Sequence, residues 1–262
     1  MKFRPCIDIH NGRVKQIVGG SLSDEGDSAR DNFVSERDAD YYAGLYRDNR
    51  LSGGHVIILN PKDSPYFAED LRQAELALST YPGGLMIGGG INADNAQYFL
   101  EKGASHVIVT SYVFREGRVD YDRLEKLVEK IGKERLVLDL SCRRRGEGYY
   151  IVTDRWQKFT EVKVDAAALV ALSAYCAEFL VHAVDVEGKA AGIDIELAGI
   201  LSTYDGIPVT YAGGVGSFDD LKALEQAGRN RLDVTVGSAL SIFGGKLDFD
   251  EVVSKYGRDD RD

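Results

Sequence analysis

The chain has 262 residues, of which 44% are hydrophobic and 28% charged, and its formal net charge at pH 7 is −10. A chain this negative suits a polyphosphate backbone poorly, so we expect it to bind no nucleic acid. It has no apolar run near the length of a membrane span, about 18 residues, and no signal peptide, so we expect a cytoplasmic protein that contacts no membrane.

The three cysteines, Cys6, Cys142 and Cys176, each lie in or beside an apolar segment and have no CxxC spacing. An odd number without metal-ligand spacing predicts neither a disulfide framework nor a zinc site. We therefore expect reduced structural thiols in a cytosol-like compartment.

Eight short apolar segments alternate with helical patterns from one end of the chain to the other. The predicted strands are FRPCIDI (3–9), GHVIILN (54–60), GLMIGG (84–89), HVIVTS (106–111), RLVLDLS (135–141), FLVHAVDV (179–186), IPVTYAG (207–213) and LDVTVGS (232–238). Near-continuous apolar strands are typical of a parallel sheet covered by helices. Eight such units in about 250 residues predict one α/β domain over 1–262, a (β/α)8 TIM barrel. A doubly wound open sheet is the alternative, but it usually has fewer strands.

Two of the intervening segments are predicted helices with defined ends. YDRLEKLVEKIG (121–132) places four apolar side chains on one face before a terminating Gly132. SFDDLKALEQAG (217–228) opens with Ser217 and Asp220 at capping-box spacing. Two long polar stretches, from Ser21 to Asp38 and, hairpin-like, from Arg143 to Trp156, are predicted as loops over the barrel mouth.

The chain contains an internal repeat. IGGGINADNAQYFLEKGASHVIVTS (87–111) and YAGGVGSFDDLKALEQAGRNRLDVTVGS (211–238) share one order of strand, glycine pair, helix, glycine, strand and small hydroxyl residue. The copies would form units three and four and units seven and eight, which lie half a turn apart in a closed ring. The barrel therefore has a twofold half-barrel repeat.

Glycines that follow a strand let backbone N–H groups approach an anion closely, so each copy predicts a phosphate site. Tight turns alone would explain a single copy equally well, but not the duplication. A barrel of eight tilted strands is roughly 15 Å across, which suits a small molecule with a phosphate at each end. The predicted contacts are Gly89, Gly90, Thr110 and Ser111 in the first copy and Gly213, Gly214, Gly237 and Ser238 in the second.

Two aspartates are predicted to point into the barrel. Asp8 alternates with two isoleucines in CIDIH, and Asp139 alternates with two leucines in VLDLSC. Both lie near the carboxyl ends of strands, one and five, where this fold places its catalytic residues. A structural aspartate paired with a basic residue is the alternative for each.

Six motifs in order carry a resemblance to a known family: CIDIHNGRVKQIVGG, GGGIN with VIVTS, LDLSCR, VDVEG, YAGGVGS and TVGSALSIFGG. Together they resemble the phosphoribosylformimino-aminoimidazole carboxamide ribotide isomerases of histidine biosynthesis, in the eukaryotic-type form. The resemblance spans nearly the whole chain. It implies an Amadori rearrangement of an aldose phosphate that is linked through nitrogen to a second phosphorylated ribonucleoside.

The resemblance also implies roles for the two acids and no metal or redox cofactor. One aspartate, matching Asp8, removes the C2 proton as general base. The other, best matched by Asp139, opens the ribose ring as general acid. Bacterial relatives carry the acid at the spacing that Ser141 holds here, two residues before Arg143. The acid should then have the more apolar surroundings and the base the more polar ones.

Four further residues are possible substrate contacts, each with a plainer alternative. His182 stands where bacterial relatives have a threonine, but a core histidine would look the same. Trp156 stands where the family stacks a tryptophan on the substrate, although a loop anchor is the alternative. Lys15 and Arg143 could contact phosphate or carboxamide, and solvated or structural charges are their default interpretation.

Three other functions stay open. One is the cyclase of the next pathway step, which is built on a similar duplicated barrel with two aspartates. That enzyme would use a lysine in the first loop to close the imidazole ring, and Lys15 is available for this role. A non-catalytic barrel could bind a phosphorylated ligand as a sensor. A nicotinamide-dependent dehydrogenase fits least, because the glycines do not match its fingerprint. We expect a monomer whose partner is a small bisphosphorylated molecule.

Overall fold

Parallel strands form the centre of the molecule. The computed structural model describes residues 1–18, 21, 29–154 and 156–257. Within them, neighbours in the parallel sheet follow chain order. These strands are β1 (Cys6–His10), β4 (Gly54–Ile58), β5 (Leu85–Gly88), β6 (Val107–Val109), β9 (Leu136–Asp139), β13 (Glu178–His182), β14 (Val209–Ala212) and β15 (Leu232–Thr235). Each overlaps one predicted segment, so the strand predictions are confirmed.

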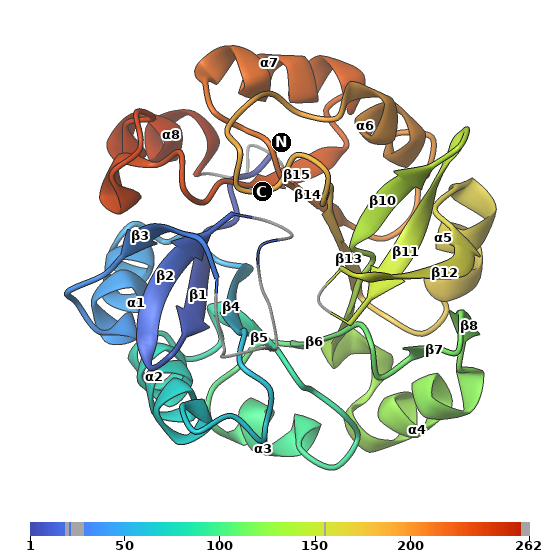
Figure 1. The fold of residues 1–262 in the computed structure, drawn as a ribbon, viewed down its shortest axis with the longest axis horizontal. Coiled ribbons are helices and arrows are strands. Elements are labelled where there is room, and N and C mark those ends of the chain that lie inside the picture. The colour runs from blue at the N-terminus through green and yellow to red at the C-terminus, as the bar shows by residue number, and fades with distance from the viewer. Residues whose placement is uncertain (19–20, 22–28, 155, 258–262) are drawn as a thin grey trace.

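The last strand returns to the first, which closes the sheet. Phe3, just before β1, forms a parallel bridge with Val234 in β15. The Val234 amide donates to the Lys2 carbonyl at 2.9 Å, and the Arg4 amide donates to the Val234 carbonyl at 2.8 Å. The parallel strands stand in a ring inside the helices (Figure 1). The predicted (β/α)8 barrel is confirmed.

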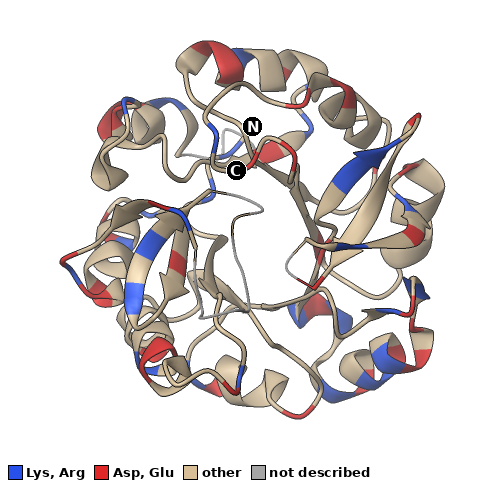
Figure 2. Ribbon diagram, in the orientation of Figure 1, with Lys and Arg blue, Asp and Glu red and all other residues tan. Residues whose placement is uncertain are grey.

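The helices surround the ring, and most charged residues lie on them and on the connections (Figure 2). The α-helices of the described chain are α1 (Ala39–Asp48), α2 (Phe67–Thr80), α3 (Ala96–Glu101), α4 (Tyr121–Ile131), α5 (Ala166–Leu172), α6 (Ile195–Leu201), α7 (Phe218–Ala227) and α8 (Phe249–Tyr256). The described residues also form two short 3-10 helices, η2 (Lys133–Arg135) and η3 (Ser241–Phe243). No helix among the described residues is both long and apolar enough to cross a membrane.

The two predicted helices end as their sequences indicate. Gly132 follows α4 with φ +77°, a conformation that favours glycine. The Ser217 hydroxyl accepts a hydrogen bond from the Asp220 amide at 3.2 Å and so caps α7. Local chemistry therefore sets both helix boundaries.

Antiparallel strands are added on opposite sides of the barrel opening (Figure 1). β2 (Arg13–Ile17) and β3 (Asp31–Val34) extend the sheet from β1, while β10 (Cys142–Arg145), β11 (Gly148–Thr153) and β12 (Lys158–Lys163) form a separate sheet. A short hairpin joins β7 (Phe114–Arg115) to β8 (Arg118–Val119). The hairpin predicted over 143–156 is confirmed. The stretch predicted as a loop over 21–38 contains β3, because its backbone pairs with β2, and residues 22–28 lie outside the described residues.

The strand alternation separates two apolar layers. Ile7, Ile9 and Leu138 are fully buried between the strands and the helices. A smaller cluster fills the inside of the barrel with Met86, Ile108, Val137, Leu180 and Ala212. The acids that alternate with the outer layer therefore face the inside.

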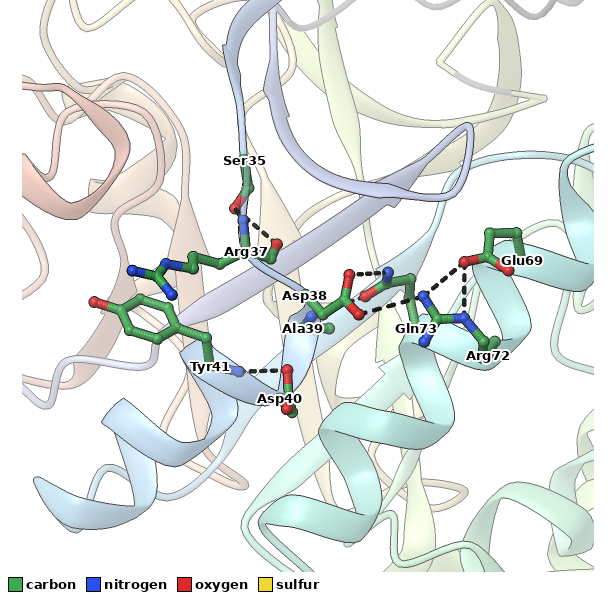
Figure 3. A network of polar contacts seen from close by, with 9 residues as sticks. All are labelled: Ser35, Arg37, Asp38, Ala39, Asp40, Tyr41, Glu69, Arg72 and Gln73. Carbon is green, nitrogen blue, oxygen red and sulfur yellow. Dashed lines mark hydrogen bonds and ion pairs between the residues drawn. The ribbon is translucent and has the colours of Figure 1, made fainter.

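A polar network holds the start of α1 against α2 (Figure 3). The Gln73 amide group donates to Asp38 at 2.7 Å and accepts from the Ala39 backbone at 2.8 Å. Arg72 bridges Asp38 and Glu69 across the same contact. Because the arginine pairs are about half exposed, the buried Gln73 contributes most of this contact.

Candidate active site

A cavity of about 360 Å³ opens at the carboxyl ends of the parallel strands. Asp8, Asp139, His182 and Trp156 line it, as do all of the predicted phosphate contacts. Those contacts are Gly89, Gly90, Thr110, Ser111, Gly213, Gly214, Gly237 and Ser238. Residues from both copies of the repeat thus share one space.

The strand order fixes how these groups face one another. β4, β5 and β6 separate β1 from β9, so Asp8 and Asp139 come from opposite walls. β6, β9 and β13 separate β5 from β14, which places the two glycine pairs on the other two walls. The line between the acids therefore crosses the line between the glycine turns.

Asp8 lies on β1, where the Gln16 side chain donates to its Oδ2 at 3.3 Å. Burial and, after it, the nearby Glu187 carboxyl raise the pKa of Asp8 to about 7, although His182 and Gln16 oppose the shift. A carboxylate with this pKa changes its protonation state close to neutral pH. That is the range in which a general base works best.

Asp139 ends β9 and is held by two neighbours. The Ser141 hydroxyl donates to Asp139 Oδ1 at 2.8 Å, and His182 Nδ1 lies 3.2 Å from the same oxygen. Burial pushes the pKa of Asp139 up, but the charge of His182 and the hydrogen bonds from His182 and Ser141 outweigh it, so the pKa is lowered. The expectation that Asp139 has the more apolar surroundings is wrong, because a cation from the neighbouring strand faces it.

His182, at the end of β13, sits among carboxyl groups. Burial lowers its pKa, but Asp139, Glu187 and Asp8 raise it to about 9. The imidazole is therefore protonated at neutral pH. Of the two sequence interpretations, a backbone-bonded core histidine does not fit, since the ring faces the cavity and Asp139.

Trp156 follows β11 and lines the cavity. Its indole Nε1 donates to the Ser141 hydroxyl at 3.0 Å. Its ring centre lies 6.0 Å from that of His182. Trp156 thus joins the connection between β11 and β12 to the hydrogen bonds around Asp139.

The lining also contains titratable residues that sequence reasoning missed, among them Glu187 and His55. Glu187 is buried, burial raises its pKa, and its Oε2 has no hydrogen-bond partner among the described residues. It belongs to the quoted VDVEG motif, so a carboxyl just after a strand end was the available signal. Burial and the His182 charge lower the pKa of His55 to about 3, so this second histidine is neutral. Nothing in its apolar strand segment marks it.

The turns after β5 and β14 contain positions where a side chain would clash with the neighbouring backbone. Gly89 has φ +98°, and a Cβ there would lie 2.0 Å from the Ile58 carbonyl oxygen. Gly214 has φ +79°, and a Cβ there would lie 2.1 Å from the Gly192 carbonyl oxygen. Only glycine allows both the backbone conformation and the close approach.

Lys15 and Arg143 lie apart from the cavity lining. Lys15 donates to Asp31 at 3.0 Å within the β2–β3 hairpin. Arg143 donates through Nε to Asp185 at 2.8 Å, with its guanidinium over the Phe159 ring. Lys15 thus pairs with Asp31 in the neighbouring antiparallel strand β3, and Arg143 in β10 pairs with Asp185 in the segment after β13, so both act as structural charges.

The chain is similar to proteins of known families over almost all of its length. A family model described as histidine biosynthesis protein matches residues 2–248. A chloroplastic imidazole-4-carboxamide isomerase of Medicago truncatula is 54% identical over 97% of this chain and 81% of its own. Imidazole-4-carboxamide isomerases of Neurospora crassa and Saccharomyces cerevisiae are each 45% identical over 94% of both chains. The chain therefore belongs to the histidine biosynthesis protein family and is an isomerase.

Proposed function

We propose that this isomerase converts phosphoribosylformimino-aminoimidazole carboxamide ribotide into its phosphoribulosyl isomer, with Asp8 as general base and Asp139 as general acid. The relatives described above are named for an isomerase of an imidazole carboxamide with two phosphoribosyl groups. A substrate of that kind carries a phosphate at each end.

The proposal rests on one observation: the line that joins Asp8 and Asp139 crosses the line that joins the two glycine turns. An elongated bisphosphate that spans the glycine turns on opposite walls would pass its middle between Asp8 and Asp139. At these turns the backbone can come close to each phosphate because the glycines have no side chains. Two acids on opposite walls could then act on different atoms of the bound sugar.

The proposed reaction moves protons only. Asp139 protonates the ring oxygen of the aldose, the bond from C1 to that oxygen breaks, and the nitrogen lone pair forms a C1=N bond. Asp8 then takes the proton from C2, which gives an enolamine. The enolamine becomes the ketone when C1 gains a proton and the C2 hydroxyl loses one, so atoms and charges balance.

Exchange of each acid for its amide tests both assignments. Asp8→Asn and Asp139→Asn should each lower kcat by about 100- to 10,000-fold while leaving the affinity for the substrate nearly unchanged, because the phosphate sites stay intact. Turnover is measured by the conversion of the purified substrate without ammonia, and affinity by calorimetric titration.

The matched control is Asp219→Asn, an aspartate whose side chain is 92% exposed, and it should keep full activity. Near-normal kcat in a folded Asp8→Asn or Asp139→Asn protein would remove that residue from the mechanism. The same assay separates the alternatives, because a cyclase needs ammonia and a sensor protein turns nothing over. The isomerase names of the relatives already favour the isomerase.

We propose also that the protein acts as a monomer in the cytoplasm and without nucleic acid. All three cysteines are buried and free, as expected for reduced thiols. The negative net charge does not favour a nucleic-acid partner. Sedimentation of the purified protein would test the monomer, localisation of the tagged chain would test the compartment, and the ratio of absorbance at 260 and 280 nm would test for bound nucleic acid.

A further inference from the structure

We propose that His182 holds the resting proton of the general acid, so that His182 and Asp139 deliver it to the sugar ring as one unit. The inference rests on the proposed function and deepens it. It concerns where the proton is before the reaction and does not alter which sugar atom receives it.

The geometry joins the two side chains directly. They come from neighbouring strands, where Asp139 pairs in register with Leu180, two residues before His182. His182 Nδ1 lies 3.2 Å from Asp139 Oδ1, and the two side chains are only 12% and 13% exposed. Both line the cavity. A proton can therefore pass between them without crossing solvent.

The charges around the pair favour an imidazolium. Asp8 approaches from β1 and Glu187 from the segment after β13, while no lysine or arginine lines the cavity within the described chain. His55 on β4 stays neutral, with its ring centre 6.1 Å from that of His182. His182 is thus the one cationic side chain among the described lining residues.

The remaining ionisable groups of the lining do not compete for this role. Cys6 is neutral because burial and the charge of Asp8 raise its pKa. Tyr112 and Asp154 also line the cavity. The Asp154 backbone amide donates a hydrogen bond to the Ser111 hydroxyl at 3.3 Å. Within the described residues, the side-chain hydrogen bonds of His182 and Asp139 join them to each other and to Ser141, and none of them involves Tyr112 or Asp154.

The pair also resolves a conflict within the proposed mechanism. A general acid must carry a proton at working pH, yet the pKa of Asp139 is lowered and that of His182 is raised. The proton that Asp139 needs is then on the imidazole beside it. Such a pair titrates as a unit, so its apparent pKa values belong to both residues.

The step balances without an outside acid. The N–H bond of His182 Nδ1 breaks as an O–H bond forms on Asp139, and the carboxyl proton passes to the ring oxygen, which keeps the electron pair of its broken bond to C1. When the ketone forms, the proton released by the C2 hydroxyl recharges the pair. Asp8 returns the C2 proton to C1.

The first test is the pH dependence of kcat. In the native enzyme kcat should fall as pH rises through about 9, where His182 loses its proton. His182→Gln keeps a side-chain N–H beside Asp139 but cannot carry this proton. We expect it to lower kcat by about 100-fold or more at pH 7.5, to change KM less than about threefold, and to abolish the alkaline fall.

The matched control is His106→Gln, a half-buried histidine that bonds Ser105 outside the cavity, and it should leave kcat and its pH profile unchanged. A folded His182→Gln enzyme with native kcat and an unchanged alkaline fall would overturn the inference. So would a raised KM at native kcat, since that pattern marks a substrate contact only.

The second test needs no turnover. The pKa of His182, followed by the NMR shift of its ring in the free enzyme, should lie near 9 and fall by at least one unit in Asp139→Asn. A value near 6.5 in both proteins would overturn the inference. If instead Asp139→Asn keeps full activity, the proposed function fails, whatever the NMR titration gives.

Discussion

At the scale of single residues, the ionised form of Asp8 lowers the stability of the folded protein. Burial and the neighbouring Glu187 raise the pKa of Asp8 to about 7, from 3.8 for an ordinary aspartate. Its charged form is therefore disfavoured in the folded protein. The proposed base is reactive near neutral pH for the same reason that its charge is costly there.

This cost predicts a pH dependence of stability. Between pH 3.8 and 7 the folded state binds more protons at Asp8 than the unfolded state does, so its contribution to stability is lost as pH rises through that window. Asp8→Asn removes the effect. The free energy of unfolding of the variant, relative to the native protein, should therefore increase with pH by on the order of 4 kcal/mol once Asp8 is ionised.

Urea unfolding from pH 4 to 8 measures this difference. The exposed Asp219→Asn variant serves as the control, and its stability should follow that of the native protein at every pH. Parallel curves for Asp8→Asn and the native protein would show that Asp8 is not held in its neutral form by the fold.

At the scale of elements, local sequence sets the strands, two helix ends and the glycine turns. YDRLEKLVEKIG and SFDDLKALEQAG give α4 and α7 because periodicity and caps act within one turn of helix. The strand β3 could not be predicted in this way. Its sequence, DNFV, forms a strand because its backbone pairs with the edge of β2. Pairing with a distant segment is not encoded in the segment itself.

The glycine turn after β14 gives a prediction at this scale. Gly214→Ala places a Cβ 2.1 Å from the Gly192 carbonyl oxygen at φ +79°, so the turn must shift. We expect KM to rise by about tenfold or more, with kcat affected less, because the phosphate contact is made equally in substrate and transition state.

Steady-state kinetics checks this result, with circular dichroism as a test of folding. Gly199→Ala on α6 is the matched control, since no atom outside the backbone of its own helix lies within 4 Å of the added Cβ, and it should leave KM unchanged. A native KM in a folded Gly214→Ala enzyme would argue against a phosphate at this turn.

At the scale of the whole molecule, the barrel is closed by contacts between the two ends of the chain. Arg4 donates to Asp233 Oδ2 through two nitrogens, at 3.1 and 2.9 Å, and lies 3.5 Å from Glu178. The Lys2 amide donates to the other Asp233 oxygen at 2.8 Å. These groups precede β1 or lie in β13 and β15, away from the cavity.

Arg4→Met should therefore lower stability without changing the chemistry. It leaves two carboxylates without their cation in a largely buried place, which costs on the order of 3 kcal/mol in the free energy of unfolding. Urea unfolding measures the loss, and kcat of the folded variant at 25 °C should remain native.

Arg47→Met is the control, because its ion pair with Asp48 is more than half exposed, and it should change the free energy of unfolding by less than about 0.5 kcal/mol. Equal losses in the two variants would show that the pairs around Arg4 do not close the barrel.

The sequence by itself determined the eight strands, the barrel class, the duplicated glycine turns and the inward direction of Asp8 and Asp139. Each depends on neighbours a few residues apart, through strand alternation or turn geometry. The prediction of a single domain over 1–262 stays a prediction. Only the tertiary structure decided which acid has the raised pKa and where the cation sits, because the pKa of each group depends on His182 and Glu187 arriving from another part of the chain.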